Sequence, residues 1–295
     1  MCNEQDLARW AHEASMTRRS FAGMAGAGAG AVVLTGALGG CVTGPYDNRL
    51  TEGAVSFSTA DGTMDGFFVR PSRMSSPTVL FWPDIAGLRE AKRSMARRLA
   101  GRGYAVLVVN PYYRDVSGEQ FADFADFAGN GGFQKVKPWR EKLTAEAIMS
   151  DATAAVGFLD AQAEVDTARG IGTQGYCMGG PFTMRTAASL PDRIGAAASF
   201  HGGGLVTDQP NSPHLLVPQM KAHYLFAIAE NDDNNQPEAK DVLRDAFSQV
   251  GLPAEIEVYT GALHGWCPPD STVYHEAQAE RAWSRLLVLF ENALA

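Results

Sequence analysis

Short apolar runs, separated by segments with helical spacing, constrain the fold of this chain most. Residues 78–82 (TVLFW) and 104–109 (YAVLVV) are apolar almost throughout rather than at every second position. That pattern is typical of strands that are buried on both faces of a sheet. Four further segments are expected to be strands, at residues 168–173, 194–200, 223–229 and 255–259.

Helical spacing marks the segments between these strands. Helices are expected up to Leu99 and at residues 141–161, 179–189, 237–250 and 275–293. Strands that alternate with helices predict an α/β fold with a mostly parallel central sheet and helices on both faces. Active sites gather at the carboxyl ends of the strands in such sheets. An antiparallel hairpin at residues 55–57 and 66–69, around Asp61-Gly62, comes before them.

Composition limits the classes of partner. The chain has 295 residues, of which 45% are apolar and 20% charged. Disordered chains, coiled coils and disulfide-rich mini-proteins do not have this combination. The 25 Lys and Arg residues against 33 Asp and Glu give a net charge of -8 and no basic surface. Nucleic acid is therefore not an expected partner.

The first 40 residues differ in character from the rest. Seven glycines fall between Ala22 and Gly40 in a stretch without charge, directly after Arg18-Arg19 and Phe21. A basic pair before an uncharged core is the layout of an export signal, with a glycine-rich linker or a membrane anchor as alternatives. The pair resembles the twin-arginine signal, whose cargo crosses the membrane already folded. The twin-arginine export machinery is therefore an expected partner.

The end of this segment, Leu38-Gly39-Gly40-Cys41, resembles a bacterial lipobox, in which the cysteine is lipidated and begins the mature protein. The predicted organisation is an export signal at 1–40 with the lipobox at 38–41, a tether at 41–50 and one catalytic domain at 51–295. We expect a periplasmic or cell-envelope location, with attachment to the membrane through a lipid on Cys41.

A cysteine stands where an expected strand meets a helix. Residues 175–180 read GYCMGG, which is the pattern of a nucleophile elbow with Cys177 in the place of serine. A helix N-terminus favours a thiolate, and the backbone N–H of Met178 is placed to face an oxyanion. A buried structural cysteine is the alternative interpretation.

A thiol nucleophile needs a base, and the base needs an orienting acid. His264 follows the expected strand at 255–259, and Asp232 and Asp233 follow the strand at 223–229. Nucleophile, acid and histidine thus occur in the chain order of α/β hydrolases. Asp232 is preferred to Asp233, although an error of one residue stays open.

With the motifs GYCMGG, AENDD and GALHGW, the chain resembles the dienelactone hydrolase family of α/β hydrolases over roughly residues 52–294. The resemblance implies a triad of Cys177, Asp232 and His264. It also implies that the loop at 82–88 (WPDIAGL) carries a carboxylate, Asp84, that modulates the thiol, and that the backbone N–H of Ile85 is a second oxyanion donor. No metal or organic cofactor is implied.

The chain departs from the family pattern in two places. Asp84 stands where the family usually has the longer Glu, so its contact with the Cys177 sulfur stays open. Of two arginines that bind the substrate carboxylate, Arg114 supplies the first, but Pro268 occupies the position of the second. Carboxylate-bearing dienelactones are thereby in doubt. Tyr112 and Tyr113 are candidate substrate contacts, with packing as the alternative.

Residues 115–142 are rich in Phe and Gly, and Phe121, Phe124 and Phe127 follow one another at intervals of three. This spacing predicts a short amphipathic helix that covers the site as a lid. A surface packing element is the alternative.

Together these features predict an exported hydrolase that cleaves a small-molecule ester, lactone or thioester through an acyl-enzyme on Cys177. One alternative is an exported binding protein that keeps the fold without its chemistry. Another is a redox pair of Cys177 and Cys267. Cys267 lies three residues after His264, so the two cysteines are expected to border one pocket.

Overall fold

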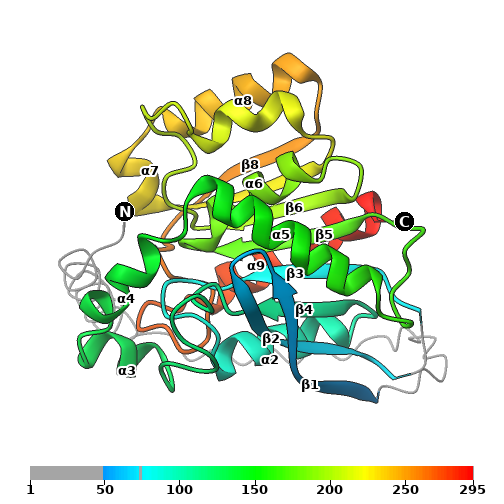
Figure 1. Cartoon of the computed structure of the whole chain (residues 1–295). Coiled ribbons are helices and arrows are strands. Elements are labelled where there is room, and N and C mark those ends of the chain that lie inside the picture. The colour runs from blue at the N-terminus through cyan, green and yellow to red at the C-terminus, as the bar shows by residue number, and fades with distance from the viewer. Residues whose placement is uncertain (1–48, 73–74, 295) are drawn as a thin grey trace, which may run out of the picture.

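An eight-stranded sheet forms the centre of the chain, in a computed structural model that describes residues 49–72 and 75–294 (Figure 1). The predicted export signal and Cys41 lie outside the described residues. The strands, in sheet order, are β1 (Leu50–Thr59), β2 (Gly62–Pro71), β4 (Ala105–Val109), β3 (Thr78–Trp82), β5 (Ile171–Tyr176), β6 (Ile194–Phe200), β7 (His223–Ala229) and β8 (Ala254–Tyr259). The β1–β2 hairpin is antiparallel and β2 pairs antiparallel with β4, whereas the other neighbours are parallel. The predicted mostly parallel sheet is confirmed.

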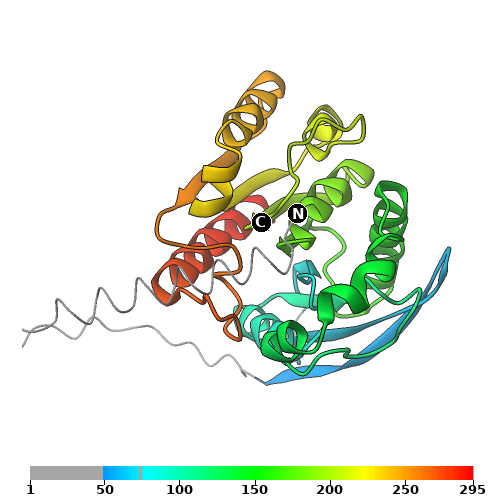
Figure 2. The ribbon, with the colours of Figure 1, turned by 90° about the vertical axis from the view of Figure 1, so that its left-hand side faces the viewer.

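Helices cover both faces of this sheet, as predicted. One face carries α2 (Glu90–Ala100) and α9 (Glu276–Ala293), which contact the strands through one apolar cluster. The other carries α5 (Ala145–Asp160), α6 (Gly179–Ser189), α8 (Ala239–Val250) and the 3-10 helix η1 (Pro213–Gln219). In Figure 2 the red α9 and the green α5 lie on opposite sides of the sheet. None of the described helices is long and apolar enough to cross a membrane.

The continuous apolar runs follow from this two-sided burial. In β3, Val79 and Phe81 pack in the cluster on the α2 and α9 face, whereas Leu80 and Trp82 pack in the cluster beneath α5. All five residues of β3 are buried. Because successive side chains of a strand point to opposite faces, a strand between two helical layers needs apolar residues at every position.

Strand β5 lies three residues further along the chain than predicted. It spans Ile171–Tyr176 rather than 168–173, and therefore ends directly before Cys177. Gly172 and Gly175 are unusual residues for the interior of a strand. They are needed here because a larger side chain would not fit at either position. A Cβ on Gly172 would come within 2.9 Å of the Phe290 ring, and one on Gly175 within 2.0 Å of the Gly179 carbonyl oxygen.

One expected helix begins later than predicted, and one short helix is additional to the predicted ones. Helix α5 begins at Ala145 rather than at 141, because the Thr144 hydroxyl accepts a hydrogen bond from the Ala147 N–H and caps the helix. The acidic segment after β7 forms a short helix, α7 (Glu230–Asn235), with its carboxylates in the first turn.

The Phe-rich segment forms two short helices, α3 (Phe124–Gly129) and α4 (Gly132–Arg140). The Asp123 carboxylate accepts from the Asp126 N–H at 2.7 Å and caps α3. Phe127 is fully buried, in a cluster with Ile85 and Tyr112. The segment thus packs against the loop that follows β3.

Candidate active site

A small cavity opens at the carboxyl ends of the parallel strands. Its lining residues come from the loop after β3, from α3, from the ends of β5 and β6, and from the loop after β8: Asp84, Ile85, Phe124, Cys177, His201, His264, Gly265, Pro268 and Ser271. The cavity volume is about 20 Å³, which holds about one water molecule. Cys177 and His264 of the predicted triad therefore line one enclosure.

Cys177 sits on a strained turn between β5 and α6. Its φ is +52°, which side chains other than glycine rarely adopt. The glycines around it permit this turn: a Cβ on Gly179 would approach the Trp82 carbonyl oxygen to 2.6 Å, and one on Gly180 the Gly202 Cα to 2.5 Å. The sequence pattern of the elbow is thus explained by close backbone approach on both sides of the cysteine.

His264 and Asp232 form a hydrogen-bonded pair. The Nδ1 of His264 lies 2.7 Å from Oδ2 of Asp232, and the His264 backbone N–H donates to the Asn231 side-chain oxygen at 2.8 Å. Asp233 instead pairs with the Lys240 amino group at 2.6 Å. The geometry therefore distinguishes the two acids and places Asp232 behind the histidine.

The charge on His264 follows from its neighbours. Burial by itself would lower the pKa of this imidazole, but the negative charge of Asp232 and the interaction with Cys177 raise it well above its ordinary value. A hydrogen bond between the Cys177 and His264 side chains adds to this rise in the pKa. Asp232 and Cys177 thus both favour the protonated form of the His264 imidazole.

The two residues predicted to be oxyanion donors lie next to Cys177 in the chain and in the cavity wall. Met178 follows Cys177 at the start of α6, and Ile85 lines the cavity from the loop after β3. The Tyr112 hydroxyl donates to the Ile85 carbonyl oxygen at 2.8 Å. Tyr112 is buried and does not line the cavity. The structure therefore gives it the role of holding the loop of Ile85.

Asp84 lines the cavity, but its carboxylate is occupied by buried cations. It pairs with the Arg89 guanidinium at 2.7 Å and with the Lys92 amino group at 2.6 Å, and it accepts from the Ala86 N–H at 3.0 Å. Burial would raise the pKa of Asp84, but the positive charges of Arg89 and Lys92 outweigh it and hold the pKa below its ordinary value. Asp84 is thus an ionised anchor for its loop.

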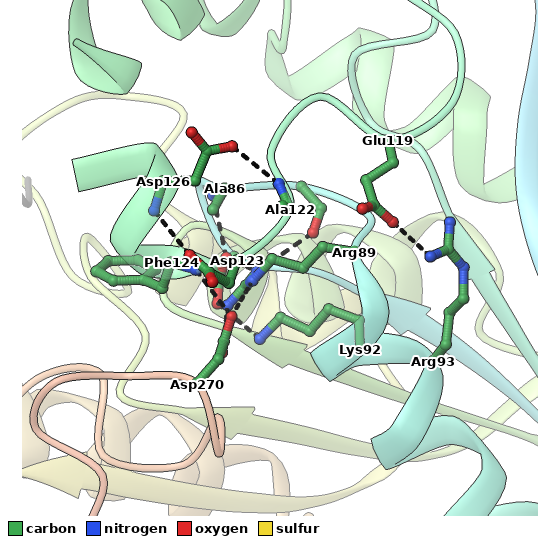
Figure 3. A network of polar contacts seen from close by, with 12 residues as sticks. Ala86, Arg89, Lys92, Arg93, Glu119, Ala122, Asp123, Phe124, Asp126 and Asp270 are labelled. Carbon is green, nitrogen blue, oxygen red and sulfur yellow. Dashed lines mark hydrogen bonds and ion pairs between the residues drawn. The ribbon is translucent and has the colours of Figure 1, made fainter. Parts of the chain in front are cut away.

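Arg89 extends this ion pair to two distant segments. Its guanidinium also pairs with Asp270, at 2.6 Å, in the loop after β8. Asp270 accepts from the backbone N–H of Phe124 at 2.9 Å, at the first residue of α3 (Figure 3). Arg89 and Lys92 were not predicted as site residues, since no local motif in their Arg-rich segment marks them.

The structure does not bring Arg114 and Tyr113 to this cavity. Arg114 pairs with Asp61 at 2.6 Å and with Asp151 at 2.8 Å, and it borders a separate open hollow with Lys142. The Tyr113 hydroxyl donates to Asp151 at 2.7 Å. Two aspartates hold Arg114 beside the β1–β2 turn. It therefore lies away from the cavity lined by Cys177, and so does Tyr113.

Neither Cys177 nor Cys267 forms a disulfide bond. Cys267 lines a different cavity, with Tyr176 and Trp283, between the sheet and the helices α2 and α9. Burial raises the pKa of the Cys267 thiol well above its ordinary value. The expectation that both cysteines border one pocket is therefore wrong, because the chain between His264 and Cys267 crosses to the other cavity.

His201 is a cavity residue that the sequence analysis did not select. It follows β6, is 1% exposed, and has a φ of +40°. Its ring centre lies 5.0 Å from that of His264. Two cues in the sequence were available: His201 directly follows the strand expected at 194–200, and the run Gly202-Gly203-Gly204 comes after it.

Comparisons with known proteins agree with this geometry. The model of the dienelactone hydrolase family matches residues 64–294. The chain belongs to this family. It is 27% identical over 249 residues to a candidate carboxymethylenebutenolidase of Salmonella typhi, covering 83% of this chain and 88% of that protein. It is 25% identical to the carboxymethylenebutenolidase of Rhodococcus opacus, over 75% and 82% of the two chains.

Among solved structures, a candidate dienelactone hydrolase from Klebsiella pneumoniae superposes with a TM-score of 0.70 at 25% identity. The match covers 83% of this chain and 99% of that one. The family and the α/β-hydrolase fold predicted from the sequence are confirmed. Within the described residues, no group of three or more His, Cys, Asp or Glu is placed to hold a metal ion.

The substitution Asp84→Asn is expected to destabilise the protein by about 3–5 kcal/mol, since it leaves Lys92 buried without its anion. The pKa of Asp84 is lower in the folded than in the unfolded chain, so the ion pair contributes stability above about pH 4, the ordinary value for Asp. That contribution is lost as the pH falls below it. Urea unfolding between pH 3 and 7 measures both effects.

The control is Asp192→Asn, which breaks an exposed pair with Lys221. It is expected to leave the unfolding midpoint unchanged, because surface ion pairs contribute little. Equal effects of the two substitutions would contradict the anchoring role of Asp84.

Proposed function

We propose that this chain is a cysteine hydrolase of carboxylic esters, lactones or thioesters. One observation carries the proposal: Cys177 on its strained turn shares a cavity with His264, whose Nδ1 is bonded to Asp232. The hydrolase names of its relatives support the same class of reaction.

Each of these residues has a separate role in the proposed acylation step. His264, oriented by Asp232, takes the proton from the Cys177 thiol, and the thiolate attacks the carbonyl carbon. The backbone N–H groups of Ile85 and Met178 stabilise the resulting oxyanion. When the tetrahedral intermediate collapses, the leaving alcohol takes the proton from His264 and the acyl group stays on sulfur.

Water completes the cycle. His264 takes a proton from a water molecule, which attacks the thioester carbonyl, and the second collapse returns the acid product and the Cys177 thiol. Asp84 stays ionised through the cycle in this proposal. Its negative charge is balanced by Arg89 and Lys92, and so does not oppose formation of the thiolate.

A degenerate binding protein is a weaker candidate. Loss of chemistry would relax the demand for a strained cysteine and for the pair of His264 and Asp232, yet both features are intact. The redox alternative has no support in the structure, because Cys177 and Cys267 border different cavities.

Replacing Cys177 by Ala is expected to abolish hydrolysis of 4-nitrophenyl acetate while leaving the thermal midpoint nearly unchanged, because the substitution removes the nucleophile and little buried area. Release of nitrophenolate measures the rate. The matched control is Cys267→Ala, which changes the other buried thiol and is expected to retain turnover. Hydrolysis by the Cys177→Ala variant at the wild-type rate would refute the proposed nucleophile.

The choice between two adjacent acids gives a second test. Asp232→Asn is expected to lower kcat/KM by about 10²- to 10⁴-fold, because the imidazole loses the acceptor that fixes its tautomer and orientation. The neighbouring change Asp233→Asn removes a carboxylate that pairs with Lys240, and its effect is expected to stay below about tenfold. The reverse ranking would assign the orienting acid to Asp233.

We also propose that the chain is exported by the twin-arginine route and anchored in the cell envelope by a lipid on Cys41. The support is the sequence of residues 18–41. Replacing Cys41 by Ser is expected to abolish metabolic labelling with a radioactive fatty acid and to move the protein from the membrane to the soluble fraction. Cys2→Ser is the matched control. Labelling that persists without Cys41 would disprove the anchor.

A further inference from the structure

The imidazole of His201 is buried without a protein partner for either nitrogen. Its side chain lines the cavity shared by Cys177 and His264, and neither Nδ1 nor Nε2 has a hydrogen-bond partner. Only its backbone is held, by a hydrogen bond from the His201 N–H to the Ala227 carbonyl oxygen at 2.8 Å. Buried polar groups are nearly always satisfied, so an orphaned imidazole beside a nucleophile points to a ligand that satisfies it.

The backbone of His201 is strained in the same way as that of the nucleophile. Within residues 49–72 and 75–294, Cys177 (φ +52°) and His201 (φ +40°) are the non-glycine residues with positive φ. Both line one cavity. Strain of this kind persists where the surrounding structure enforces it, and it gathers at functional sites.

The charge state and position of His201 define the group it can bind. Burial lowers the pKa of His201 well below its ordinary value, and the positive charges of His264 and Lys92 lower it further. The ring is therefore neutral, with one nitrogen that donates and one that accepts. It crosses the His264 ring nearly edge to face, at 65°, and so lies beside the reacting atoms.

Apart from His264, whose charge is already paired with Asp232, the walls offer no cation for a charged substrate. Arg89 is fully buried, and its guanidinium is shared between Asp84, Asp270 and the Gly87 carbonyl oxygen. Lys92 pairs with Asp84, and Pro268 lines the wall at the position where the family pattern has an arginine. An ionised carboxylate would lose its hydration here without gaining a counter-ion.

We infer that His201 is a substrate-binding residue that hydrogen-bonds a hydroxyl group next to the scissile carbonyl, and that the substrates are uncharged, hydroxyl-bearing esters or lactones. The inference rests on the proposed function of Cys177. A hydroxyl both donates and accepts, as a neutral imidazole does, whereas an unsubstituted substrate leaves the ring unsatisfied.

The test compares α-hydroxy-γ-butyrolactone with γ-butyrolactone in a pH-stat, each rate divided by that of its alkaline hydrolysis to remove intrinsic reactivity. The wild-type protein is expected to prefer the hydroxylated lactone by at least about tenfold in kcat/KM. In His201→Phe, which keeps a flat ring without nitrogens, this ratio is expected to fall about tenfold or more. His201→Asn keeps a donor and an acceptor on a residue that tolerates positive φ, and is expected to restore part of the ratio.

His223→Phe is the matched control. This half-buried histidine is the first residue of β7 and so lies at the amino ends of the strands, whereas the cavity lies at their carboxyl ends. It is expected to leave the ratio unchanged. A wild-type ratio near one, an unaltered ratio in a folded His201→Phe variant, or a preference for a carboxylated lactone would each overturn the inference. The wild-type ratio decides even where the Phe variant does not fold.

Failure of the proposed function is recognised separately. Alkylation by iodoacetamide, followed by peptide mass analysis, reports whether Cys177 is the reactive thiol. Turnover that depends on Cys177 without a preference for hydroxylated lactones refutes the role of His201 alone. Turnover that survives the loss of Cys177 refutes both.

Discussion

The buried ion pair between Asp84 and Arg89 is the interaction on which the site depends. Charged groups are costly to remove from water unless each finds a partner, and here each does: Arg89 pairs with Asp84 and Asp270, and Lys92 with Asp84. These charges join the loop after β3, helix α2 and the loop after β8. The loop after β3 and the loop that carries His264 therefore hold a fixed separation, because neither can move without exposing a buried charge.

The architecture was accessible from the sequence because the periodic patterns and the packing agree. Strands β3, β6 and β7 have the predicted bounds, since burial on both faces demands apolar residues throughout. Cys177, Asp232 and His264 were selected for the same reason: in a parallel sheet, residues that directly follow strands share one edge. The three strand ends β5, β7 and β8 bring them together although they are far apart in the chain.

What the sequence did not reveal depends on contacts between distant residues. The strand predicted at 168–173 lies at Ile171–Tyr176, and its glycines Gly172 and Gly175 are required by the close packing of α9 and α6, which no local pattern shows. Arg114 follows a strand as a substrate-binding residue would, but Asp61 and Asp151 lie within reach and bind it. His201 lacked a motif because the role proposed for it rests on burial and on a backbone angle, and residue types do not specify either of these.

The small volume of the cavity has a consequence for the shape of a substrate. The space beside Cys177 holds about one water molecule, whereas His264 also lines a neighbouring hollow of about 160 Å³ together with Gly202 and Asp232. A bound ester would therefore place its carbonyl group in the narrow space beside Cys177 and its larger group in the hollow that borders His264. Phe124 lines the narrow space, and its backbone N–H is bonded to Asp270. The charge pairs of Arg89 would thus also limit how wide the space beside Cys177 can become.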